Sequence, residues 1–307
     1  MRIVFFGTPE FAVPSLKALL ESDEEVAAVV TQTDKRKGRD STPTPAPIKK
    51  LALERGVRVL QPRNMREPEF LSELESLMPD LIVVVAYGKI LPPRILTLPR
   101  RGCINVHASL LPKYRGAAPI QWALLEGEKK TGVTTMLMDE GLDTGAILFQ
   151  EEVDISADDN AETLGRKLSV IGASVLMKTI GRIGEGSLLP IPQSGAASFA
   201  PPLKKGDGRI DWSKPAEQLR NFVRGMYPWP GAYCYLNHER IKITGVTVLD
   251  GSGEPGSIVN AEERLVVGTG RGLLSIVELQ PEGRRIMTAR AFLRGRKLCA
   301  GVSFNGQ

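Results

Sequence analysis

Three polar residues, Asn105, His107 and Asp143, have side chains and positions that could perform chemistry together. Asn105 and His107 stand in the apolar segment GCINVHA. Alternate side chains of a strand point to opposite faces, so these two project from one face. Asp143 follows the apolar segment VTTMLM in the loop DEGLDTG, whose glycines permit a tight turn.

An amide, an imidazole and a carboxylate in one place suit the transfer of an acyl-like group to an amine. Asn105 would donate hydrogen bonds to a tetrahedral oxyanion, and His107 would relay a proton. Asp143 would orient the imidazole and favour its charged form. No Ser or Cys nucleophile is needed, because the substrate brings its own amine.

Each of these residues also has a simpler interpretation. An Asn-x-His pair is a weak signal by itself, because a buried histidine often only satisfies hydrogen bonds in a core. The tripeptide Asp143-Thr144-Gly145 is also the catalytic motif of aspartic proteases, which need two such carboxylates sharing one proton. This chain has a single DTG, within an α/β pattern. A catalytic role for His107 therefore requires a fold that brings Asp143 to it.

Alternating segments must position these residues. Strand-like apolar runs cover 2–6, 26–30, 81–87 and 102–108, and helical patterns cover 14–20, 47–56, 70–78 and 160–183. This alternation predicts an α/β fold with a doubly wound, mostly parallel, Rossmann-like sheet covered by helices on both faces. Ligands of such sheets bind beyond the carboxyl ends of the strands, where His107 falls. The first turn, FGTPEFAVP, lacks the GxGxxG pattern, which argues against a nicotinamide or flavin site.

The second half has a different character. A stretch rich in Gly, Pro, Ser and Ala predicts a linker at 190–207, which separates a catalytic domain at 1–189 from a smaller domain at 208–307. The short strand-like segments of the latter predict an OB-like β-barrel. From Lys204 onward the chain has 16 Lys and Arg against 10 Asp and Glu. Of the chain's 40 basic and 35 acidic residues, 24 basic and 25 acidic ones therefore lie before Lys204. The basic excess suggests nucleic acid as a partner, with ordinary surface scatter as the alternative.

Other features limit the class of protein. The three cysteines are widely spaced and form no CxxC pair, which favours a reducing compartment and no zinc site. The aliphatic run LIVVVA is far shorter than the roughly 20 apolar residues of a membrane span. The N-terminus has no zones typical of a signal peptide. We therefore expect a cytoplasmic protein without a membrane partner.

The segments INVHASLLPKYRGAAPIQ and MDEGLDTG resemble the signature of the 10-formyltetrahydrofolate-dependent formyltransferases. The similarity continues through GTPEFAVPSL, AYGKILP, DGRIDWSKPAEQL and YPWPGAY, and so covers essentially the whole chain. Within that family it points to the members that formylate methionine on initiator methionyl-tRNA for translation initiation. The resemblance implies direct transfer through a tetrahedral intermediate, with 10-formyltetrahydrofolate as co-substrate. We expect no metal or nucleotide cofactor, and a monomeric protein.

The resemblance also implies site residues. The matching catalytic positions are Asn105, His107 and Asp143. The implied folate-binding residues are Ser109, Leu110, Leu111, Pro112, Tyr87, Ile90 and Leu91. The implied tRNA-binding residues lie in the basic loop at 33–50 and are Lys35, Arg36, Lys37, Arg39 and Lys49. The family often has Gly-Arg-Gly in this loop, whereas Asp40 follows Arg39 here. A solvated surface loop is the alternative interpretation of these charges.

The catalytic core alone does not select the acceptor. Relatives with the same Asn, His and Asp formylate a purine-precursor amine, hydrolyse the formyl group or modify an amino-sugar nucleotide. The basic loop and basic C-terminal domain favour a large anionic acceptor. A non-catalytic RNA-binding protein on the same scaffold is a further alternative, disfavoured because all three catalytic positions are intact.

Overall fold

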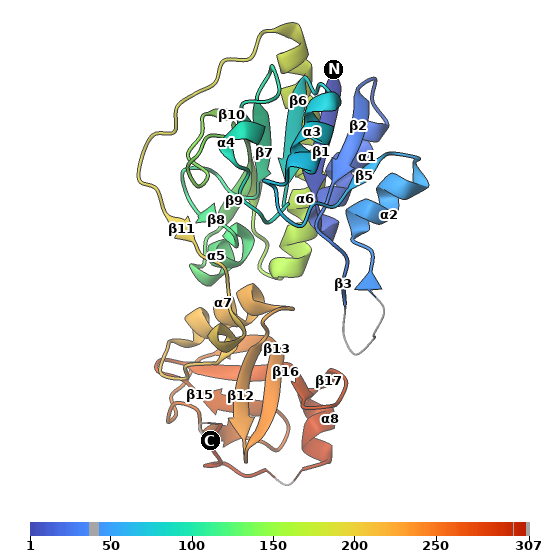
Figure 1. The fold of residues 1–307 in the computed structure, drawn as a ribbon. Coiled ribbons are helices and arrows are strands. Elements are labelled where there is room, and N and C mark those ends of the chain that lie inside the picture. Colours follow the sequence, from blue (N-terminus) through green and yellow to red (C-terminus); the bar gives the residue numbers. More distant parts are fainter. Residues whose placement is uncertain (37–42, 297, 305–307) are drawn as a thin grey trace. The chain divides into compact units, whose positions relative to one another are not determined.

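The computed structural model describes residues 1–36, 43–296 and 298–304, which divide into two compact units (Figure 1). The N-terminal unit comprises 1–119, 130–154 and 165–201, and the C-terminal unit comprises 120–129, 155–164 and 202–307. The main division thus falls after Pro201, within the predicted linker. Two short segments that the sequence analysis assigned to the N-terminal domain, 120–129 and 155–164, belong to the C-terminal unit.

The N-terminal unit is built on a mixed sheet with the strand order β10-β9-β7-β6-β1-β2-β5. Its strands are β1 (Arg2–Gly7), β2 (Glu25–Val30), β5 (Val59–Leu60), β6 (Leu81–Val85), β7 (Cys103–His107), β9 (Lys130–Leu137) and β10 (Ile147–Asp154). The five neighbouring strands β5, β2, β1, β6 and β7 are parallel. Strand β9 runs antiparallel to both β7 and β10. The predicted mostly parallel α/β sheet is therefore confirmed, with an antiparallel edge.

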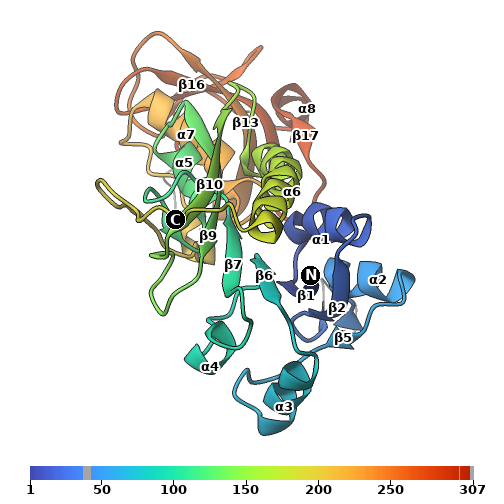
Figure 2. The same ribbon diagram turned by 90° about the horizontal axis from the view of Figure 1, so that it is seen from above.

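Helices cover both faces of this sheet. They are α1 (Val13–Leu20), α2 (Pro47–Glu54), α3 (Pro68–Ser76), α4 (Pro93–Leu96) and α6 (Ala161–Glu185). Figure 2 shows α1 and α6 on one side of the sheet and α3 and α4 on the other. Proline opens α2, α3 and α4, since its fixed φ suits the first turn and its missing N–H leaves no donor unpaired there.

The sheet face that packs against α3 and α4 also carries Asn105 and His107. Alternate strand residues supply its apolar cluster, and the one from β7 is Cys103. The next residues on that face of β7 are Asn105 and His107. The opposite face of β7 packs against α6, where Val106 lies close to the backbone of Gly172. The polar pair thus continues an apolar row toward the carboxyl end of the strand.

Two short strand pairs complete the N-terminal unit. One joins β3 (Lys35–Arg36) to β4 (Pro43–Thr44) at the base of the basic loop. The other joins β8 (Arg115–Gly116) to β11 (Phe199–Ala200), so residues just before the end of this unit pair with the segment that follows His107.

The C-terminal unit contains an antiparallel half-barrel with the strand order β12-β13-β16-β15-β14, and β17 pairs with β16. These strands are β12 (Ala232–Leu236), β13 (Glu239–Leu249), β14 (Ile258–Asn260), β15 (Leu265–Gly268), β16 (Leu273–Pro281) and β17 (Met287–Thr288). Its helices are α5 (Pro119–Leu125), α7 (Ala216–Met226) and α8 (Ala289–Arg294). The predicted small β-barrel domain is confirmed at this level, and α5 and β14 are elements that the sequence did not indicate.

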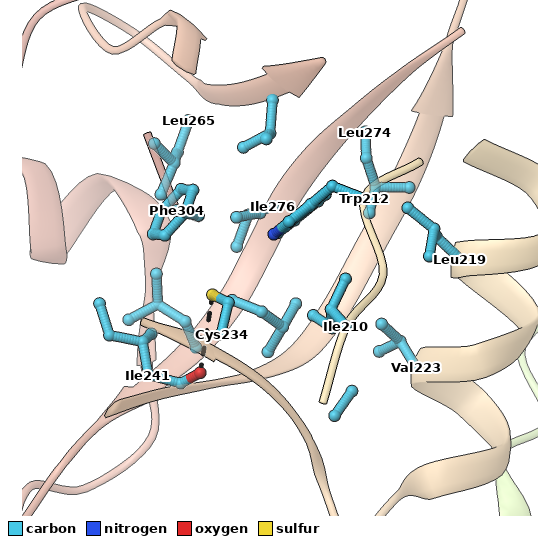
Figure 3. Packing of buried hydrophobic residues seen from close by; sticks show 14 of the residues in the cluster. Ile210, Trp212, Leu219, Val223, Cys234, Ile241, Leu265, Leu274, Ile276 and Phe304 are labelled. Carbon is cyan, nitrogen blue, oxygen red and sulfur yellow. Dashed lines mark hydrogen bonds between the residues drawn. The ribbon is translucent and has the colours of Figure 1, made fainter. Parts of the chain in front are cut away.

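The apolar core of this unit joins α7 to the strands of the half-barrel (Figure 3). Leu219 and Val223 of α7 face Ile276 and its neighbours on the strands, as expected for a helix with one apolar stripe. Trp212 stacks on Phe304 with ring centroids 5.9 Å apart. This contact fastens the chain before α7 to residues near the C-terminus.

Two of the three cysteines are enclosed in these cores. Burial raises the pKa of the Cys103 thiol to about 12, and it also raises the pKa of Cys234, whereas Cys299 is exposed. Because the thiolate is the reactive form, we expect one fast-reacting thiol in the native protein at pH 8 and three in denaturant. Titration with a chromogenic disulfide would measure both numbers. Cys299→Ser should remove the fast reaction, and fast labelling of a second thiol in the native state would contradict these core placements.

Candidate active site

Asn105 and His107 lie in the carboxyl-terminal half of β7. His107 is only 5% exposed, and its Nε2 lies 2.9 Å from the carbonyl oxygen of Tyr114. A carbonyl oxygen only accepts, so Nε2 carries a proton in this contact. The ring is thereby fixed with Nδ1 facing away from Tyr114, toward the side on which Asp143 lies.

Asp143 lies in the hairpin loop between β9 and β10. Since β9 is antiparallel to β7, its last residue, Leu137, pairs with Ile104, at the far end of β7 from His107. The loop must therefore fold back along the sheet to bring Asp143 to the site. Asp139 supports this path by accepting hydrogen bonds from the amide of Gly141 and the hydroxyl of Thr144.

The backbone of this loop is tightly constrained at two positions. Asp143 has a φ of 53°, in the left-handed region that few residues other than glycine and Asn or Asp adopt. A Cβ at Gly145 would overlap the carbonyl oxygen of Leu137 and stand 2.8 Å from its carbonyl carbon, so only glycine fits. This close approach fixes the direction in which the carboxylate leaves the loop.

The three side chains converge as the candidate chemistry requires. Asp143 Oδ2 is 3.6 Å from His107 Nδ1 and accepts a hydrogen bond of 2.8 Å from the amide of Gly116. Asn105 Nδ2 donates to Asp143 Oδ1 at 3.4 Å. The Asn–Asp contact is long and the His–Asp separation exceeds a direct hydrogen bond, as is common in catalytic sites before substrate binds. The carboxylate of Asp143 therefore lies beside both the amide donor and the imidazole.

The segment Ser109-Leu110-Leu111-Pro112 forms a firmly held turn after β7. Ser109 is fully buried and its hydroxyl donates to the carbonyl of Lys113. The amide of Leu111 donates to Thr134, and the carbonyl of Leu111 accepts from the side-chain amide of Gln150. Leu111 is buried, while half-buried Leu110 packs on the bare backbone of Gly132. The turn's shape is thus set by β9 and β10.

The other predicted folate-binding residues have separate positions. Tyr87 is a core residue, because its ring packs edge-on against Phe6 and its hydroxyl donates to the sulfur of Met65. Burial raises the pKa of this phenol to about 12. The polar contact of Tyr87 is instead made by its backbone carbonyl, which accepts a hydrogen bond from the side chain of Gln32.

Ile90 and Leu91 line a cavity of about 420 Å³. Its remaining walls are Arg63, Asn64, Met65, Arg66, Lys89, Pro92, Pro93 and Glu140. Glu140 belongs to the loop that carries Asp143, so this one loop contributes both to the cavity wall and to the polar cluster. Sequence reasoning missed the cations of this cavity; their place on loops beyond β5 and β6 was the available signal.

The predicted tRNA-binding residues are divided between described and undescribed parts of the chain. Lys35 and Arg36 form β3, while Lys37 and Arg39 lie outside the described residues. The ammonium of Lys49 pairs with Asp34 at 2.6 Å. The pKa of Asp34 is lowered, first by that hydrogen bond and then by one from Gln61. Lys49 therefore has a partner within its own domain.

The described residues hold neither a group of metal-binding side chains nor a membrane-spanning helix. Within 1–36, 43–296 and 298–304, no His, Cys, Asp and Glu side chains gather in a group of three or more that could hold a metal ion. Over the same ranges, no helix has the length and apolar character needed to cross a membrane.

An α/β sheet that carries an Asn, a His and an Asp together is typical of enzymes that transfer a formyl group, and comparison with known families gives the same class. The chain belongs to the formyl transferase family: the formyl transferase model matches residues 1–180, and the model of the family's C-terminal domain matches residues 202–297. The methionyl-tRNA formyltransferase of Thermodesulfovibrio yellowstonii is 56% identical over 300 residues, 98% of this chain and 97% of that protein. The enzyme of the same name from Caldanaerobacter subterraneus subsp. tengcongensis is 52% identical over 306 residues, 98% of this chain and 99% of that protein.

A solved structure shows the same fold at lower sequence similarity. The sugar 3N-formyl transferase WlaRD, crystallised in the presence of dTDP and 5-N-formyl-THF, is 20% identical with a TM-score of 0.68, over 93% of this chain and 99% of that one. This match supports the arrangement of strands and helices, and the acceptor must be argued from other observations.

Proposed function

We propose that this protein transfers the formyl group of 10-formyltetrahydrofolate to the free α-amino group of methionine on initiator methionyl-tRNA, for translation initiation. The observation that carries the proposal is the convergence of Asn105, His107 and Asp143 at one end of β7. Similarity to methionyl-tRNA formyltransferases along nearly the whole chain supports the choice of acceptor.

The first step is attack by the amine on the formyl carbon. An α-amino group has a reference pKa of about 7.7 to 8.0, so a sizeable fraction is neutral at physiological pH. As the new C–N bond forms, the formyl oxygen becomes an oxyanion. We assign the N–H donor for this oxyanion to the side chain of Asn105. Its hydrogen bond to Asp143 Oδ1 is long, at 3.4 Å, so the donor can turn to the oxyanion at little cost. A fixed donor stabilises the oxyanion more than the uncharged carbonyl.

The second step breaks the bond between the formyl carbon and N10 of the folate. The attacking nitrogen must lose a proton, and the departing N10 must gain one. His107 is placed to relay this proton through Nδ1, because Nε2 is held by the carbonyl of Tyr114. The carboxylate of Asp143, 3.6 Å from Nδ1, stabilises the positive charge that the imidazole carries during the relay.

The cavity lined by Ile90 and Leu91 suits the folate. Its volume lies in the range of small-molecule sites, which are mostly apolar with a few polar groups. Ile90 and Leu91 offer apolar surface to a flat heterocycle, and Arg63, Arg66 and Lys89 offer positive charge to the carboxylates of the co-substrate's glutamate. We also assign the turn of Ser109 to Pro112, which β9 and β10 hold in place, to the folate site, because the family resemblance implies it.

The basic surfaces suit the nucleic acid. We propose that residues 1–189 perform the chemistry, that 190–207 connect the domains, and that 208–307 bind tRNA together with the basic loop of Lys35, Arg36, Lys37, Arg39 and Lys49. Phosphate contacts from such residues give affinity that falls as salt rises. A monomer acting in the cytoplasm, where translation begins, completes the proposal.

Formyl transfer assayed with several acceptors tests the proposal. The protein would be mixed with 10-formyltetrahydrofolate labelled in the formyl group and with charged initiator tRNA, uncharged initiator tRNA, a purine-precursor amine or an amino-sugar nucleotide. We expect acid-precipitable label only on methionyl-tRNA, with the uncharged tRNA as its control. Transfer to a small amine alone, or release of formate without transfer, would overturn the proposal.

A further inference from the structure

The segment at 191–200 is held along the N-terminal unit, and we call it the strap. Ile191 exchanges two backbone hydrogen bonds of 2.8 Å with Ile147 of β10. Farther along, Ser198 and Ala200 bind the backbone of the segment that follows His107, at Arg115 and Ala118. The strap therefore touches both chain segments that shape the candidate active site.

Gln193 in the strap connects these two segments through its side chain. Its Nε2 donates to the carbonyl oxygens of Asp143 and Gly145, both at 2.8 Å. Its Oε1 accepts from Arg115, at 3.1 Å from Nε and 2.6 Å from Nη2. Both amide hydrogens and the carbonyl oxygen are thus used, and the side chain is half-buried.

The two segments joined by Gln193 are also joined at the catalytic carboxylate. Gly116, the neighbour of Arg115, donates its amide to Asp143 Oδ2. Gln193 binds the backbone of Asp143 on one side and Arg115 on the other, so it spans that same junction. Because Asp143 has a left-handed φ, its backbone is held by its surroundings, and Gln193 provides one hydrogen bond to its carbonyl and a second to that of Gly145.

We propose that Gln193 is a positioning residue for formyl transfer, which keeps Asp143 beside His107 by fixing the loop backbone against Arg115. The proposal rests on the proposed function for its kinetic consequence. It also gives the strap a role in the reaction besides that of connecting two domains.

Two substitutions separate the contacts of Gln193. Gln193→Ala removes all of them. Gln193→Glu keeps an acceptor for Arg115 but removes both donors and sets a carboxylate against two carbonyl oxygens. We expect both variants to lower kcat by about 10- to 100-fold, since displacements near 1 Å can cost that much, with little change in KM for the folate. The pH dependence of kcat should also change shape, because the carboxylate no longer keeps a fixed place beside His107.

Hydrogen exchange supplies a readout independent of activity. The amide of Gly116 should exchange faster in both variants, since its acceptor is Asp143 Oδ2. Ser194→Ala is the matched control, because Ser194 is the exposed neighbour of Gln193 in the strap. Wild-type kcat and Gly116 protection in Gln193→Ala, or wild-type kcat in Gln193→Glu, would overturn the proposal. If the wild-type protein formylates no methionyl-tRNA, the proposed function fails, while Gly116 exchange still decides whether Gln193 holds Asp143.

Discussion

Replacing Asn105 with alanine is expected to lower kcat about 10²- to 10³-fold while leaving folate binding intact. The size follows from the loss of one preorganised oxyanion donor. Folate binding should persist because the cavity that we assign to the folate is lined by other residues. The fold should also persist, because the one hydrogen bond that the Asn105 side chain makes to the described residues is the long one to Asp143. Steady-state kinetics with charged initiator tRNA, together with calorimetric binding of 5-formyltetrahydrofolate, would measure the two effects separately.

Asn105→Asp sharpens this experiment. The aspartate has nearly the size of asparagine but offers an acceptor in place of the donor, and it adds negative charge where the oxyanion forms. We expect a loss of kcat at least as large as for alanine. Asn260→Ala, at an exposed strand end in the C-terminal unit, is the control for an asparagine removed elsewhere. Near-normal turnover in either Asn105 variant would refute the oxyanion role.

The sequence predicted the half of the site that lies on one strand. The apolar runs of β6 and β7 and the alternation within β7 were sufficient to place Asn105 and His107 together on one face. It was less informative about Asp143. β10, with the sequence ILFQEEVD, carries several charges, and the sequence analysis did not recognise it as a strand. The glycines of the loop predicted a tight turn that could bring the carboxylate back, but the antiparallel β9–β10 hairpin that directs this turn was not predicted.

Gln193 illustrates a second limit. Its surroundings, rich in Pro, Gly, Ser and Ala, indicated a linker, and local composition does indicate weak intrinsic structure. The strap is held by backbone bonds to residues about 40 to 85 positions earlier in the sequence. Such bonds depend on the path of the whole chain and leave no periodic signal. The half-barrel strands β12, β13, β15 and β16, in contrast, were predicted because each has its own apolar pattern.

Replacing Gly145 with alanine is expected to reduce kcat by about 10²-fold or more without unfolding the protein. The added Cβ would overlap the carbonyl oxygen of Leu137, a backbone atom that no rotamer change can move. The hairpin must therefore open near Asp143 and shift its carboxylate relative to His107, and displacements of about 1 Å can cost 10²-fold in rate. We expect a stability loss of about 1 to 3 kcal/mol, as for other overpacked sites. Kinetics and thermal unfolding would measure the two quantities.

The same substitution at Gly181 provides the control, because it lies in α6 and a Cβ there would meet no atom within 4 Å. Gly181→Ala should keep full activity and gain up to about 1 kcal/mol, since alanine loses less backbone entropy in a helix. Gly116 exchange distinguishes a local shift from general loosening: in Gly145→Ala only amides near the Asp143 loop should lose protection. If Gly145→Ala keeps wild-type kcat, the rate does not depend on where this loop holds Asp143, and the carboxylate's role beside His107 must be abandoned.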